Sequence, residues 1–186
     1  MKKLILIFQI QIEIDYLNDQ ILISNSGNNE ILILNSSFNF ISKINQKNKF
    51  NEEDNQLNDP NQIKLNSQNE IIISDSKNIS YFNSFSNNFD FLFSINQENF
   101  GKDLYDENSE IYFTIDYFDN LIVSDYYNHS IKFFNPNGNL ISFFGNGEGN
   151  NLNQFNSPSG ICFGNKNQNS ILICDCYDHK FKIIEW

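Results

Sequence analysis

The chain has 186 residues and carries 12 lysine side chains against 23 acidic ones, which gives a formal charge of -11. It contains 34 Asn, 27 Ile and 19 Phe but neither Ala nor Arg, and this composition favours strands and turns over helices. The negative charge and the missing guanidinium groups argue against nucleic acid and anionic membranes as partners. No apolar stretch approaches the roughly 20 residues of a membrane-spanning helix.

One segment recurs four times along the chain. In each copy an apolar run is followed by a small residue and then by an acidic or amide residue, here called the anchor. The copies are Ile21–Asn25, Ile71–Asp75, Leu121–Asp125 and Ile171–Asp175, so the four anchors lie 50 residues apart. A fixed period of this length is typical of repeat architectures, in which each repeat is one small structural unit.

Each copy predicts a group of short strands. The apolar run is a strand with two buried faces, and the anchor side chain can bond the backbone of a tight turn before the next strand. That next strand begins at Ile31, Ile79, Ile131 or Phe181. A shorter strand precedes each pair, at Ile12–Ile14, Ile63–Leu65, Ile111–Ile115 and Ile161–Phe163. Another follows the first three pairs, at Phe40–Ile44, Phe89–Ile95 and Leu140–Phe144.

Four strands per copy, with each sheet covered by its neighbours, is the layout of propeller blades. We therefore predict an all-β fold with about four blades in a single repeat domain, residues 1–186. The blades fall at approximately 9–44, 57–95, 105–144 and 155–186. The segment 45–62 is rich in Asn, Gln, Glu and Asp, and it is expected to be a polar loop between the first two blades.

Two motifs carry a family resemblance. The segment Phe144–Ile161 contains Phe-Gly, a Gly-rich turn and Phe-x-x-Pro-x-Gly-Ile, and it resembles the blade-to-blade connection of NHL repeats. Asp125-x-x-Asn-His-x-Ile131 resembles the central turn of that family. In the second copy, Leu57-x-x-Pro60 keeps the entry motif, although Gln62 stands in place of Gly. The resemblance implies NHL-like repeats in a β-propeller, commonly six-bladed and usually a binding platform attached to other domains.

Four anchors are fewer than the resemblance implies, and we expect an incomplete or open propeller. Leu4–Phe8 is the candidate for a missing outer strand of the last blade. An outer strand of the last blade and the inner strand of the first blade would lie about three strand spacings of roughly 4.8 Å apart. Almost no linker remains after Leu4–Phe8 to cover that distance. Open blade edges then predict self-association, or completion of the ring by a partner.

The candidate chemistry has a structural explanation in the repeat. The resemblance places a structural His at His129 and His179, although a metal pair is the alternative. Asp75, Asp125 and Asp175 could form a carboxylate ring for calcium or acid catalysis. Turn bonding explains these residues better, together with Asn25 at the fourth equivalent position. Cys174 and Cys176 beside His179 suggest a zinc site, but Cys174 stands where the other copies have Ser, and Cys176 where they have Ser26, Ser76 and Tyr126. We expect no catalytic residue, no metal and no cofactor, and the odd number of cysteines indicates a cytoplasmic, reducing environment.

Three tyrosines lie in the central turns, Tyr126, Tyr127 and Tyr177. Aromatic side chains on one face of a propeller are typical of binding surfaces, although burial against an adjacent loop is the alternative. The sequence therefore predicts a non-catalytic platform for a protein or peptide partner. The resemblance extends this to part of a larger ubiquitin-ligase-type or scaffold protein. The alternative is a metal-dependent propeller enzyme of the lyase or lactonase class.

Overall fold

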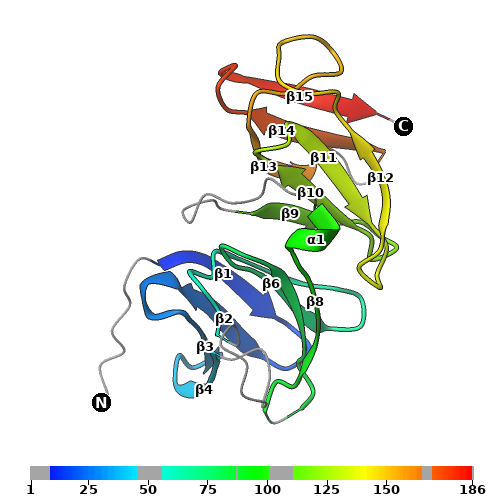
Figure 1. The fold of residues 1–186 in the computed structure, drawn as a ribbon. Coiled ribbons are helices and arrows are strands. Elements are labelled where there is room, and N and C mark those ends of the chain that lie inside the picture. Colours follow the sequence, from blue (N-terminus) through cyan, green and yellow to red (C-terminus); the bar gives the residue numbers. More distant parts are fainter. Residues whose placement is uncertain (1–8, 46–55, 87, 101–110, 165–168, 186) are drawn as a thin grey trace. The chain divides into compact units, whose positions relative to one another are not determined.

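The computed structural model describes residues 9–45, 56–86, 88–100, 111–164 and 169–185, and their regular structure is almost entirely β-strand (Figure 1). The strands make four antiparallel sheets, in each of which every strand pairs with the next one along the chain. The chain divides into two compact units, Met1–Ser94 and Ile95–Trp186. The prediction of an all-β fold with four small sheets is confirmed.

The first unit contains two sheets of four strands. The first sheet consists of β1 (Gln9–Asp15), β2 (Gln20–Asn25), β3 (Glu30–Asn35) and β4 (Phe40–Ile44), with a 3-10 turn η1 (Ser26–Asn28) after β2. The second sheet consists of β5 (Gln62–Leu65), β6 (Glu70–Ser74), β7 (Ile79–Asn83) and β8 (Phe91–Ile95).

The second unit repeats this layout. Its first sheet consists of β9 (Tyr112–Ile115), β10 (Leu121–Asp125), β11 (Ser130–Phe134) and β12 (Leu140–Phe144). Its second sheet has three strands among the described residues, β13 (Pro158–Phe163), β14 (Ser170–Asp175) and β15 (Lys180–Glu185). A helical turn that the composition did not predict, α1 (Gln97–Phe100), precedes the first of these sheets.

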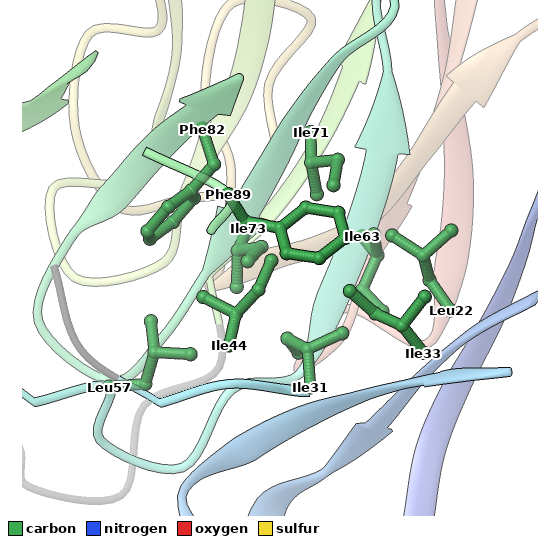
Figure 2. Close-up of a cluster of buried hydrophobic side chains, with 10 residues drawn as sticks. All are labelled: Leu22, Ile31, Ile33, Ile44, Leu57, Ile63, Ile71, Ile73, Phe82 and Phe89. Carbon is green, nitrogen blue, oxygen red and sulfur yellow. The ribbon is translucent and has the colours of Figure 1, made fainter. Parts of the chain in front are cut away.

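Apolar side chains from the two sheets of the first unit interlock in one core (Figure 2). Leu22 and Ile33 point from the first sheet toward Ile63 and Ile71 of the second, and all four are fully buried. Burying a side chain of this size contributes roughly 1.5–3 kcal/mol. Leu57 enters the same core from the connection between the sheets, so the end of the predicted polar loop is packed rather than solvated.

The second unit has the equivalent core. Ile122 and Ile131 of its first sheet pack against Ile171 and Ile173 of its second, and Phe155 enters from the connection as Leu57 does in the first unit. Two predicted features, the strand at Leu4–Phe8 and residues 46–55 of the loop, lie outside the described residues. In the part of the chain that the structure describes, no helix is long and apolar enough to cross a membrane.

Candidate functional site

Three of the four anchors are fully buried carboxylates, and two of these, Asp75 and Asp125, bond the backbone of their own turns. In the first unit, Asp75 Oδ1 accepts hydrogen bonds from the N–H groups of Lys77 (2.9 Å) and Asn78 (2.8 Å). In the second unit, Asp125 Oδ1 accepts from the N–H of Asn128 (3.2 Å). These contacts are the turn bonds that the residue type favours, because a short carboxylate reaches the backbone two or three residues ahead.

The remaining two anchors use different contacts. The amide of Asn25 donates to Glu30 Oε1 (2.9 Å) across the turn. Asp175 Oδ1 instead accepts from the N–H of Asn156 (2.6 Å), in the segment that enters the last sheet. Asp175 therefore fastens the incoming connection to the end of its strand.

Each anchor carboxylate of the second unit also forms a buried ion pair that the sequence reasoning missed. Lys182 Nζ lies 2.8 Å from Asp175 Oδ2, and Lys132 pairs with Asp125 in the same way. Both ammonium groups also donate to backbone carbonyls and lie over a phenylalanine ring, Phe155 for Lys182. The lysine follows its anchor by seven residues in both copies, which is the signal that could have predicted the pairs.

A hydrogen bond links successive sheets within each unit. The Ser157 N–H donates to His129 Nδ1 (3.1 Å), and in the first unit the Asp59 N–H donates to Asn29 Oδ1 (2.8 Å). All four residues have positive φ, a region in which Asn, Asp and His are enriched among non-glycine residues. His179 has the same backbone conformation as His129, with φ of 51°, and its side chain is exposed.

The three predicted tyrosines gather around one open hollow of the second unit. The rings of Tyr126 and Tyr127 meet edge to face with centroids 5.0 Å apart, and the ring of Tyr177 lies 6.2 Å from that of Tyr126. The hollow has a volume of about 600 Å³ and is lined further by His129, Glu148, Asn156 and Ser157. Tyr177 is 62% exposed, so its ring is available to a ligand.

The hollow offers hydrogen bonding and aromatic contact. A hydrogen bond with Tyr177 raises the pKa of Tyr126, and partial burial raises it further. The Tyr126 phenol therefore keeps its proton near pH 7 and can both donate and accept a hydrogen bond. The Glu148 carboxylate and the Asn156 amide add an acceptor and a donor at the rim. Such a surface suits a partner with aromatic or apolar groups flanked by polar ones.

The other predicted residues lie elsewhere. Asp125 and Asp175 are buried in their sheets, and Asn25 and Asp75 belong to the first unit. Within the described ranges, no three His, Cys, Asp or Glu side chains are grouped so that they could hold a metal ion. Sequence reasoning missed Glu148, Asn156 and Ser157 as lining residues. They belong to the Gly-rich connection of the NHL resemblance, and this was the available signal.

No protein-family model matches the chain, and no curated protein matches it in sequence. Solved structures match it in shape. The β-propeller domain of Cps50 (Swd1) from Myceliophteria thermophila matches with a TM-score of 0.65 and 12% identity, over 94% of this chain and 50% of that one. The chain has a β-propeller fold.

Two further solved structures that match the chain have different functions in their names. Virginiamycin B lyase from Staphylococcus aureus matches with a TM-score of 0.61 and 13% identity, over 96% of this chain and 55% of the lyase. An auxiliary nutrient binding protein from Bacteroides thetaiotaomicron matches with a TM-score of 0.64 and 15% identity, over 92% of this chain and 46% of that protein. The propeller chain thus spans about half the length of each of these structures.

Proposed function

We propose that this chain is a non-catalytic, NHL-like propeller module that binds a protein or peptide through the hollow of Tyr126, Tyr127 and Tyr177. The observation that carries the proposal is the convergence of three tyrosines from two sheets on one open hollow of about 600 Å³. Tyrosine is enriched in binding hot spots because a rigid ring provides contact area and its hydroxyl provides a hydrogen bond.

The surroundings of the tyrosines support a binding role. Their turns are held by the ion pairs of Asp125 and Asp175 and by the bond between His129 and Ser157. A ligand would meet rings that are already positioned, which lowers the entropy lost on binding. His129 Nδ1 already accepts a backbone hydrogen bond, so that nitrogen serves the structure of the hollow.

A selection from a phage-displayed library of linear peptides tests the proposal. Selected peptides should bind the intact chain, and Tyr177→Ala should weaken them by about tenfold or more, the scale of a hot-spot residue. Tyr117→Ala is the matched control, since Tyr117 is an exposed tyrosine of the same unit that does not line the hollow. Equal loss in both variants would reject the hollow as the binding site.

The alternative class, a metal-dependent lyase or lactonase, predicts a different result. It requires a stoichiometric transition metal that survives dialysis and is lost in His129→Ala or His179→Ala. Elemental analysis of the purified chain with these two variants decides between the classes. If one equivalent of metal is bound and either variant loses it, the binding-module proposal is wrong and the enzyme class takes its place.

The proposal also includes assembly in the cytoplasm through the edge of the last sheet. Among the described strands, β15 pairs with β14 alone, and a cavity of about 540 Å³ runs beside β15 next to Phe144 and Phe155. Phe181 and Ile183 of β15 are exposed. Open strand edges with apolar side chains favour pairing with another chain. Light scattering should show association that Phe181→Lys reduces, and a wild-type monomer at high concentration would contradict it.

A further inference from the structure

One end of the first unit presents large apolar side chains to solvent, well away in sequence from the tyrosine hollow. Four turns meet at this end, β1–β2 (Asp15–Gln20), β3–β4 (Asn35–Phe40), β5–β6 (Leu65–Glu70) and β7–β8 (Asn83–Phe91). The exposed fractions are 86% for Tyr16, 67% for Leu17, 73% for Phe38 and 61% for Phe85. These four side chains are called the apolar tips.

The fold does not require apolar residues at Tyr16 and Leu17. In the β1–β2 turn, Asp15 Oδ1 accepts from the N–H groups of Leu17 and Asn18, both at 3.0 Å. In the corresponding β5–β6 turn, which is one residue shorter, Asn66 Oδ1 accepts from the N–H of Glu70, and Ser67 and Gln68 occupy the tip. Side chains this exposed gain little from burial, so their apolar character needs another explanation.

Phe38 is unfavourable to the fold in two respects. Its φ is +61°, and the residue in the same place of the β11–β12 turn is Gly138, with φ of +78°. Both turns have the same hydrogen bond, from the N–H of Phe38 to the carbonyl of Asn35 and from the N–H of Gly138 to the carbonyl of Asn135, each at 2.9 Å. A non-glycine residue in this conformation strains the backbone. The ring is 73% exposed, so packing offsets little of that strain.

A hydrogen-bonded network holds the four turns together. Asn69 Nδ2 donates to Asp15 Oδ2 (3.0 Å) and to Ser84 Oγ (2.9 Å), which ties three turns to each other. Ser36 Oγ donates to Asp19 Oδ2 (2.5 Å) and ties in the β3–β4 turn. Asp15 and Ser84 are buried, so this network forms a rigid base beneath the tips. Apolar groups on a rigid base are preorganised for binding.

The charge at this end indicates the kind of partner. Three acidic side chains of these turns reach the surface, Asp19, Glu70 and Asp90, and the turns contain no lysine in their sequence. We propose that the apolar tips dock a cationic peptide segment in which Lys or Arg alternates with bulky apolar residues. Complementary charge guides such a segment to the surface, and the tips supply the apolar contact. A second copy of this chain, with its formal charge of -11, lacks that complementarity.

The test uses a fluorescent peptide that alternates lysine with leucine, titrated against the full chain at physiological ionic strength. Two variants remove the tips by copying the chain's own turns. Phe38→Gly recreates the Gly138 turn, and Tyr16→Ser with Leu17→Gln gives the β1–β2 turn the polar residue types of Ser67 and Gln68. We expect the first to weaken binding about fivefold and the second about tenfold or more, in line with hot-spot losses.

The matched control changes the equivalent turn of the second unit, Tyr117→Ser with Phe118→Gln, and should leave the affinity within about twofold. Phe38→Gly should also unfold at the same or a higher temperature, because it relieves the backbone strain. Equal affinity in all variants would mean nonspecific attraction to an acidic protein and would overturn the proposal. Equal binding of a serine–leucine peptide, or tighter binding to zwitterionic lipid vesicles, would overturn it as well.

Discussion

The buried ion pair of Asp125 and Lys132 supports a quantitative prediction about stability. Asp125 is fully buried, the Lys132 side chain is 9% exposed, and Lys132 Nζ also donates to the carbonyl of Phe100. Replacing Lys132 by Leu leaves a buried carboxylate that, among the described residues, keeps the hydrogen bonds from Asn128 but no cation. Breaking a buried pair from one side costs about 3–5 kcal/mol, and we expect Lys132→Leu to fall in that range.

The first sheet of the chain supplies the matched double variant. At the same positions it has Asn25 and Leu32, a neutral pair that folds in the same arrangement of strands. Asp125→Asn combined with Lys132→Leu should therefore cost only about 1 kcal/mol, because replacing both partners of a buried pair is often close to neutral.

Urea denaturation followed by circular dichroism measures the four members of this cycle, with the slope of the transition checked for constancy. The account predicts a strong coupling, in which the double variant is far more stable than the sum of the two single changes implies. Additive effects would refute the reasoning, since they would show that the two charges do not stabilise each other in the folded chain.

Three further outcomes follow from the geometry. His129→Ala should destabilise the second unit by about 1–2 kcal/mol, because the hydrogen bond from Ser157 is lost. His129→Asn should be tolerated, because Asn adopts positive φ readily. Thermal unfolding of both variants measures the difference. Tyr126 should keep its proton above the ordinary pKa near 10, and Tyr177→Phe should lower that pKa in an ultraviolet titration. The stability that the raised pKa contributes is fully present below pH 10, and it is lost as the pH rises through the raised pKa of the folded state. Burial raises the pKa of Cys174, so at pH 8 iodoacetamide should modify it more slowly than the two exposed cysteines, as read by mass spectrometry.

The repeat made the sheets predictable. A run such as Ile71-Ile72-Ile73 has buried side chains on both faces, so it must lie between two layers, and the anchor after it marks the turn. The same alignment located the tyrosine turns, because Tyr126 and Tyr177 follow equivalent anchors. Local pattern was sufficient for these features because neighbouring residues determine them.

Contacts across strands and sheets were not predictable in the same way. The pairing of Asp175 with Lys182 depends on the register of β14 and β15, and the bond from Ser157 to His129 depends on how one sheet follows another. The helical turn α1 has a composition that also suits a loop. From the sequence alone, Phe38 looks like any other apolar residue of the chain. Its positive φ and its exposure become known only from the structure.

The central claim is that the tyrosine hollow binds a peptide or protein, and labelled tyrosine side chains test it directly. A chain carrying carbon-13 at the tyrosine rings is titrated with a peptide selected against the intact protein and followed by nuclear magnetic resonance. The account predicts saturable shifts of the Tyr126, Tyr127 and Tyr177 signals, with the Tyr117 signal unchanged. Shifts at Tyr117 or Tyr16 while the three hollow signals stay in place would contradict it.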